Sequence, residues 1–181
     1  MEHGEDCYRR FLAGDESAFT EVVEAYRDPV TFFIQRYVHD LCAAEDIAMD
    51  VFMQLVLHPG KWRQDTPLKT YLLMLARSRA IDHLRQIKRH PAVALEDAEG
   101  WLADTHSLEE TVLQNERARI LHEALDKLPQ DQQTAVHLVY FEECSYADAA
   151  RIMKKSAKQI DNLLYRAKKA LKEQIGEEVA Q

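Results

Sequence analysis

Apolar residues recur at helical spacing along almost the whole chain. Over residues 16–28, for example, Phe19, Val22, Val23 and Tyr26 would share one face of a helix. The 181 residues include only 5 glycines and 5 prolines, and no stretch shows the alternation of a half-buried strand. We therefore expect an all-α fold.

Local signals divide this pattern into separate helices. Pro29 predicts a break after the first of them, with the next beginning at Val30. Residues 58–60, His-Pro-Gly, predict the end of the helix that begins near residue 43. Thr66 and Pro67 are typical of the cap and first residue of a long helix.

An acidic segment without helical period separates two helical parts. Residues 91–106 contain a proline and a glycine, and we expect a linker there with one contact at Trp101 and Leu102. Ser107 and Glu110 form a capping box that opens the next helix. The prediction is two small helical domains, 1–90 and 107–181, joined by an acidic linker over 91–106.

The net charge of -8 conceals two basic segments. Residues 61–90 carry eight basic against two acidic side chains, and residues 145–174 carry eight against three. Each segment can serve a polyanion locally although the chain as a whole is acidic. A solvated helix face is the alternative for each.

Residues 145–171 contain two helix starts only eleven positions apart. Ser145 with Asp148, and Ser156 with Gln159, each match a capping box. This spacing predicts a helix-turn-helix, in which the N-terminal end of the second helix enters the major groove of DNA. The alternative is a helical hairpin with a solvated basic face. The side chains expected at base edges are Ser156, Lys158, Gln159 and Asn162, and those expected at phosphates are Lys154, Lys155, Arg166, Lys168 and Lys169.

The first basic segment, residues 61–90, interleaves cations with aromatic rings, and we call it the aromatic–basic segment. Trp62 and Tyr71 offer stacking surfaces for single-stranded bases, unless they are simply core residues. The cations around them are Lys61, Arg63, Lys69, Arg77, Arg85, Lys88 and Arg89.

The helix near residues 43–57 has an exposed face that does not suit DNA. This acidic–methionine face, opposite the apolar stripe, comprises Glu45, Asp46, Met49, Asp50 and Met53. Such a face fits a basic, partly apolar groove on a protein partner, although acidic residues near a helix start also complement the helix dipole.

Together these segments resemble a bacterial RNA polymerase sigma factor of the small extracytoplasmic-function group. Residues 44–52, AEDIAMDVF, resemble the part of sigma region 2 that docks on the polymerase clamp helices. Residues 67–85 are similar to the part that melts and reads the minus-ten element. Residues 125–171 are similar to the region 4 helix-turn-helix for the minus-thirty-five element.

The resemblance implies region 2 over 1–90, region 4 over 107–181, and core RNA polymerase and promoter DNA as partners. It further implies an anti-sigma factor. The net charge of -6 over residues 91–127 motivates the hypothesis that acidic linker residues mimic nucleic acid in the polymerase channel. The implied minus-ten residues are Lys61, Trp62, Arg63, Lys69, Tyr71, Arg77, Ser78, Arg85 and Arg89. The implied minus-thirty-five residues are Lys154, Lys155, Ser156, Lys158, Gln159, Asn162 and Arg166, and the implied polymerase contacts are Glu45, Asp46, Met49, Asp50 and Met53.

Several positions depart from the pattern of this family. Met49 replaces a common glutamine, Tyr71 a tryptophan and Ser78 an asparagine. Lys154 replaces a turn glycine, so a left-handed backbone there would cost about 1 kcal/mol. Gln159 stands where threonine is frequent, and we expect a promoter preference that differs from that of common members.

Other classes of protein fit the residues less well. There is no glycine-rich phosphate loop, nucleophile elbow or metal-ligand spacing, so we expect no enzyme, cofactor or metal site. Cys7, Cys42 and Cys144 are far apart and are expected to be reduced thiols. No signal peptide or apolar span is evident, so a cytoplasmic location without membrane insertion is expected. A helix-turn-helix regulator that acts without polymerase is the remaining alternative; it would leave the acidic–methionine face and the aromatic–basic segment unused.

Overall fold

The computed structural model describes residues 2–89 and 120–178, and all regular structure within these two ranges is helical. The all-α prediction is confirmed. The predicted linker, the contact at Trp101 and the capping box at Ser107 lie outside the described residues. None of the described helices combines the length and apolar character needed to cross a membrane.

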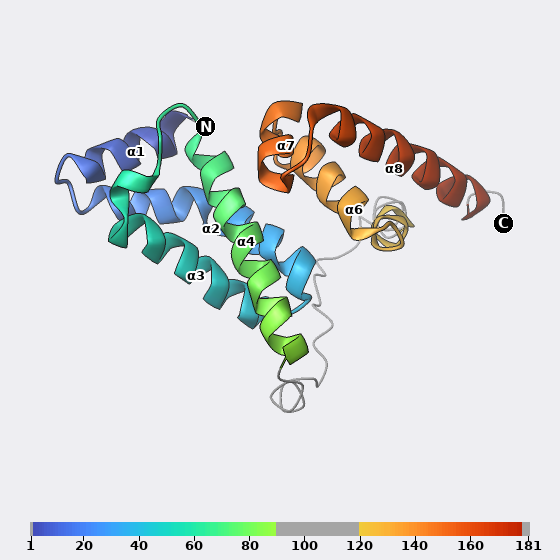
Figure 1. Ribbon diagram of the computed structural model, residues 1–181, viewed down its shortest axis with the longest axis horizontal. Helices are drawn as coiled ribbons and strands as arrows, with labels where there is room; N and C mark the ends of the chain where they lie inside the picture. The colour runs from blue at the N-terminus through green and yellow to red at the C-terminus, as the bar shows by residue number, and fades with distance from the viewer. Residues whose placement is uncertain (1, 90–119, 179–181) are drawn as a thin grey trace, which may run out of the picture.

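Two groups of helices make up the described chain (Figure 1). The first contains α1 (Glu2–Leu12), α2 (Ala18–Val38), α3 (Leu41–Leu57), the 3₁₀ turn η1 (Pro59–Lys61) and α4 (Leu68–Arg89). The second contains a helical segment over 120–126, α6 (Gln130–Val136), the π-helical turn η2 (His137–Phe141), α7 (Tyr146–Met153) and α8 (Ala157–Glu178).

Helix α2 continues through Pro29, so the predicted break is wrong. Proline in a helix interior loses one backbone hydrogen bond and crowds the preceding turn. Here Tyr26 before the proline, and Phe33 and Ile34 after it, are buried in the same core. Packing of this shared face therefore outweighs the local cost of the proline.

Helix α1 was not predicted, and it contacts both α3 and the start of α4. Tyr8 is fully buried; its hydroxyl donates to the Leu55 carbonyl at 3.1 Å, and its ring meets the edge of Trp62 at a centroid distance of 5.4 Å. The Glu5 carboxylate accepts from the Leu68 backbone N–H at 2.9 Å and thereby caps the start of α4. Thr66 was expected in that role, but a carboxylate 63 residues away in sequence takes it.

The helix-turn-helix geometry of α7 and α8 is confirmed, together with both serine N-caps, but only Ser156 and Gln159 form a complete capping box. Ser145 Oγ accepts from the Asp148 N–H at 3.1 Å, and Ser156 Oγ accepts from the Gln159 N–H at 3.2 Å. Lys154, which ends α7, has φ 55° and ψ 45°. The chain therefore turns through a left-handed residue at the position where the family pattern has glycine.

The two groups of helices share one continuous cluster of buried apolar residues. Helix α4 packs beside α7, and α2 meets α6 and η2 through specific contacts. The Tyr37 hydroxyl lies 3.0 Å from Thr134 Oγ1, Gln130 Nε2 donates to the Arg36 carbonyl at 3.0 Å, and Phe33 stacks on His137. The two predicted domains are thus in direct contact in this structure.

Candidate nucleic-acid interface

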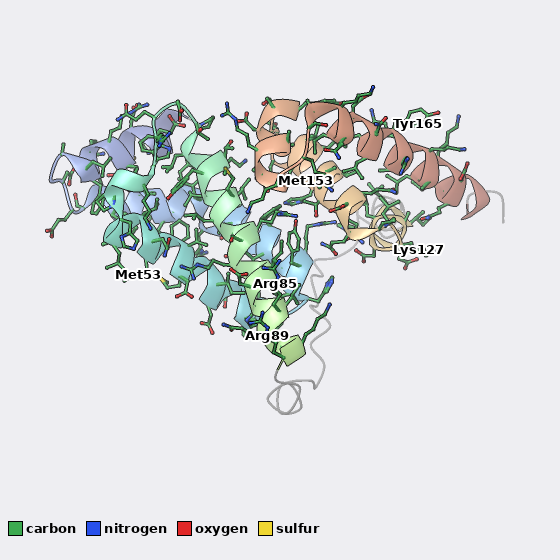
Figure 2. All side chains as sticks on the ribbon, in the orientation of Figure 1. Met53, Arg85, Arg89, Lys127, Met153 and Tyr165 are labelled. Atoms are coloured by element: carbon green, nitrogen blue, oxygen red, sulfur yellow. The ribbon has the colours of Figure 1, made fainter. Side chains whose placement is uncertain are left out.

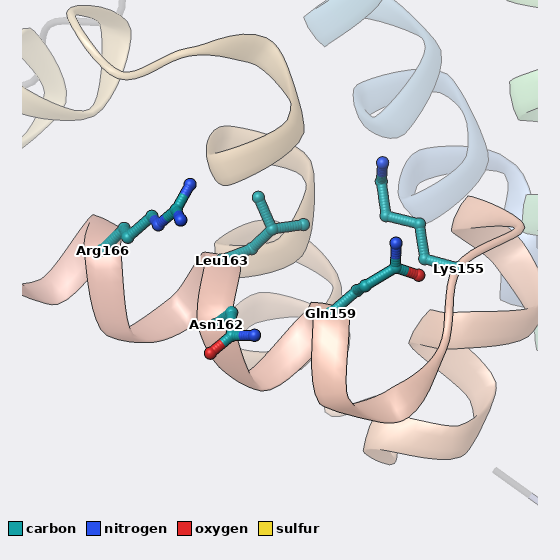
Figure 3. A pocket seen from close by; sticks show the side chains of 5 residues that line it. All are labelled: Lys155, Gln159, Asn162, Leu163 and Arg166. Atoms are coloured by element: carbon teal, nitrogen blue, oxygen red, sulfur yellow. The ribbon is translucent and has the colours of Figure 1, made fainter.

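A shallow hollow beside α8 brings together four of the nine predicted base-reading and phosphate-binding residues. Ile160, Leu164 and Ala167 are buried, which fixes the orientation of the helix. Side chains flanking the buried face line the hollow, namely Lys155 from the turn before α8 and Gln159, Asn162, Leu163 and Arg166 from α8 (Figure 3). A surface with two amides, two cations and one apolar residue has the donors and acceptors that major-groove recognition needs.

The two amide side chains of the hollow differ in which of their atoms are free to bind a base. Gln159 Oε1 accepts from the Ser156 backbone N–H at 2.7 Å, so its oxygen is already used within the capping box. The Asn162 side chain is exposed and makes no hydrogen bond within the described part of the chain. Bidentate pairing with an adenine needs both atoms of the amide, so Asn162 is the side chain ready for it.

Cations around the hollow are partly engaged by neighbouring side chains. Lys155 Nζ lies 3.0 Å from a carboxylate oxygen of Asp131 on α6. The Lys168 ammonium lies 5.3 Å from the ring centroid of Tyr140, and a hydrogen bond with this tyrosine raises the pKa of the lysine. Lys154, Lys158 and Arg166 are exposed.

In the aromatic–basic segment, Trp62 is a core residue. Only 6% of it is exposed, its indole N–H donates to the Thr66 carbonyl at 3.0 Å, and its ring packs on Tyr8. The core alternative is therefore confirmed for Trp62, and in this conformation no base can stack on the ring. Tyr71 is half-buried on α4, and this burial raises the pKa of its hydroxyl.

Lys69 is the minus-ten residue whose surroundings differ most from the prediction. Its ammonium lies 2.7 Å from Glu142 Oε2 and donates to the Glu142 carbonyl at 3.0 Å. Glu142 Oε1 lies 3.2 Å from His137 Nε2, and all three side chains are largely buried between the two groups of helices. Lys69 is therefore not free for a phosphate in this arrangement.

Glu142 remains charged in this contact despite its burial. Burial raises the pKa of a carboxyl group, but the interactions with His137 and Lys69 outweigh it and hold the pKa of Glu142 below its ordinary value. The π-helical turn η2 places Glu142 and His137 side by side. Nothing in the local sequence marks Glu142 as the partner of a lysine 73 residues away.

The remaining predicted minus-ten residues extend along α4 rather than forming a single cluster. This helix has 22 residues and is therefore about 33 Å long. Arg77 is half-buried and interacts with Tyr37. Arg85 and Arg89 lie toward the far end of the helix (Figure 2). The exposed members of the set are Lys61, Arg63, Ser78, Arg85 and Arg89.

The acidic–methionine face lies on the outer side of α3. Ile47, Val51 and Phe52 are buried on the inner side, while Met49 is 59% exposed and Met53, labelled in Figure 2, is 47% exposed. All five predicted residues of this face are exposed. Val56 and Leu57 are exposed too and extend the apolar part of the face.

Both halves of the chain match family models of one protein family. Residues 22–90 match Sigma-70 region 2, and residues 118–171 match Sigma-70 region 4. The RNA polymerase sigma-H factor of Pseudomonas aeruginosa is 31% identical over 179 residues, which cover 94% of this chain and 93% of the relative. The ECF RNA polymerase sigma-E factor of Haemophilus influenzae is 28% identical, with 92% of each chain covered.

Solved structures share the fold. The sigma factor RpoE of Bartonella quintana, solved with the anti-sigma factor NepR, matches with a TM-score of 0.67 at 23% identity and covers 87% of this chain and 96% of its own. CnrH, solved with the cytosolic domain of CnrY, matches with a TM-score of 0.64 at 16% identity and covers 94% and 95%. The chain belongs to the extracytoplasmic-function group of RNA polymerase sigma factors.

Proposed function

We propose that this sigma factor binds core RNA polymerase through the acidic–methionine face of α3 and directs it to promoters by contacting DNA in two different forms. Region 2 over residues 1–90 would capture melted minus-ten bases. Region 4 over residues 107–181 would hold the duplex at minus thirty-five, with residues 91–106 as the linker. The observation that supports this most directly is the α8 hollow, in which exposed Asn162 and Arg166 lie beside Gln159.

Duplex binding by region 4 combines positioning with reading. Lys154, Lys158 and Arg166 can neutralise phosphates, which sets the register without selecting sequence. Asn162 can select a base, and Gln159 keeps its amide N–H₂ free to donate even while its oxygen caps α8. The hollow therefore supports sequence-specific binding in which Asn162 can pair with a base through both amide atoms and Gln159 through its N–H₂ alone.

Single-strand capture by region 2 requires more surface than this conformation exposes. Strand opening costs a few kcal/mol for each unstacked base, and stacking on an aromatic ring recovers ~1–3 kcal/mol. Tyr71 is half-buried and Lys69 is bound to Glu142. We infer that α4 binds promoter DNA only after region 4 moves away from it.

Control by an anti-sigma factor and a cytoplasmic location are part of the proposal. Two solved relatives carry partners, NepR and the cytosolic domain of CnrY, and NepR is described as an anti-sigma factor. The exposed methionines and carboxylates of α3 would offer such a partner the same face that we assign to polymerase. Competition for one face would make inhibition direct.

Run-off transcription with core polymerase on a promoter library tests the proposal and reads the promoter consensus together. The purified chain should direct initiation from a defined subset of the library. A helix-turn-helix regulator acting without polymerase would bind DNA but would neither co-purify with core enzyme in equal amounts nor start transcripts. Failure to direct any initiation in the absence of an inhibitor would overturn the proposal.

A further inference from the structure

The N-terminal helix carries a cluster of metal-ligating side chains outside the surfaces described so far. His3 and Cys7 stand one turn apart on α1, and Glu21 faces them from α2. Their candidate ligand atoms, one from each residue, all lie within 4.8 Å of one another. The sequence shows no recognisable ligand spacing here because the third residue comes from a different helix.

The distances between these atoms match a tetrahedral ion. Cys7 Sγ lies 3.7 Å from His3 Nε2 and 3.2 Å from Glu21 Oε2, and the latter two atoms are 3.7 Å apart. Zinc bonds of about 2.0–2.3 Å at tetrahedral angles put neighbouring ligand atoms about 3.3–3.6 Å apart. Small side-chain adjustments would bring all three onto one ion, with a fourth position left for water.

The surroundings hold the ligands in place. Arg10 Nη1 donates to both oxygens of Glu21, to Oε1 at 3.1 Å and to Oε2 at 3.3 Å, and thereby holds the carboxylate beside Cys7. Cys7 is 1% exposed, and burial together with Glu21 raises the pKa of its thiol. Without a metal the thiol keeps its proton and donates a hydrogen bond to Glu21. On metal binding this proton leaves to solvent and the thiolate becomes a ligand.

We propose that His3, Cys7 and Glu21 form a zinc-class metal site that fastens α1 to α2. One thiolate, one imidazole and one carboxylate favour Zn²⁺ over the hard cations Mg²⁺ and Ca²⁺. The site has a consequence for α4, because Glu5, which caps that helix, lies on α1 between the two ligands. Metal binding would therefore stabilise the start of the helix assigned to minus-ten recognition.

Metal titration of the full-length chain tests this site. After chelation, wild type should take up one equivalent of Zn²⁺ in competition with a chromophoric chelator, and one of Co²⁺ with a thiolate-to-cobalt absorption band. Cys7→Ser should abolish the band, and Glu21→Gln, which can still accept from Arg10, should weaken binding at least tenfold. Cys42→Ser, at an exposed cysteine, is the matched control and should leave the band intact.

His3→Ala keeps the test decisive if the buried Cys7 variant folds poorly. The His3 side chain is 78% exposed, so its loss should leave the fold intact and still weaken zinc binding at least tenfold. Zinc should also raise the midpoint of thermal unfolding of wild type and slow amide exchange at the start of α4, but do neither in His3→Ala. Equal zinc affinity in wild type and His3→Ala, no uptake by wild type, or a cobalt band lost in Cys42→Ser would overturn the proposal.

Discussion

Gln159 and Asn162 stand one turn apart on α8, yet they differ in what they are free to bind. The oxygen of Gln159 caps its own helix, whereas Asn162 is exposed with its whole amide available. Sequence alone treats the two as equivalent readers, because both amides can pair with adenine. The difference comes from the capping box, which uses Gln159 for structure before DNA arrives.

Asn162→Ala should therefore be a clean test of base reading. We expect a loss of ~1–3 kcal/mol in binding to the promoter sequence, with no change in binding to random duplex. The thermal midpoint should not fall below that of wild type, since the Asn162 side chain has no partner in the described structure and alanine is the better helix former. Fluorescence anisotropy at one salt concentration measures both affinities, and an equal loss on both DNAs would mean that Asn162 only positions the helix.

Lys154 is the second residue whose backbone carries a prediction. Its φ of 55° lies in the left-handed region, which glycine adopts without strain. Lys154→Gly should be more stable than Lys154→Ala by about 1 kcal/mol, because both variants lose the charge and only the alanine keeps a Cβ. Urea unfolding measures the difference; alanine equal to or better than glycine would show that the turn is not strained.

At the scale of helices, local signals predicted ends and caps better than they predicted contacts. The end of α3 before Pro59 and the serine N-caps at Ser145 and Ser156 follow from neighbouring residues, and the structure confirms them. The break at Pro29 was wrong because buried residues on both sides hold α2 together. Helix α1 was missed, although Cys7, Tyr8 and Phe11 have helical spacing.

The same holds for the candidate sites: features set by neighbouring residues were predictable, and contacts between residues distant in sequence were not. The exposed acidic–methionine face of α3 and the α8 hollow follow from helical periodicity. The burial of Trp62, the cap that Glu5 provides and the pairing of Lys69 with Glu142 do not, because their partners are distant in sequence. Only the packed structure brings these groups together.

Reversal of one charge on α3 tests the surface assigned to polymerase. Asp50→Lys should weaken core-polymerase binding at least tenfold, about 1.4 kcal/mol, because the partner groove is expected to be basic. Glu24→Lys makes the same change of charge at an exposed site on α2 and should leave affinity unchanged. Competition with a labelled sigma factor measures both; equal affinities for Asp50→Lys and wild type would remove this face from the proposal.

At the scale of the whole molecule, the contact between Lys69 and Glu142 joins the two halves. Removing the charge of a hydrogen-bonded carboxylate costs about 1–3 kcal/mol. Glu142→Gln should therefore favour separation of the halves. Small-angle scattering should report a larger radius of gyration for this variant than for wild type, and equal radii would show that other contacts suffice.

The contact between Lys69 and Glu142 also predicts that the association of the two halves depends on pH. Because the pKa of Glu142 is held below its ordinary value of 4.5, its stabilising effect is fully present above that value and is lost as the pH falls through the lowered pKa. The wild-type halves should thus separate on acidification, as followed by scattering across the pH range. Glu142→Gln should lack this component, and an identical acid transition in both proteins would assign it to other groups.

Two lysines that could bind DNA phosphates are paired with carboxylates of the chain itself: Lys69 with Glu142, and Lys155 with Asp131. A chromosome offers a vast excess of non-cognate duplex, on which an openly basic protein would be sequestered. Self-neutralisation of this kind would weaken binding of the unassembled factor to such duplex. It would thereby leave more of the factor available to bind core polymerase.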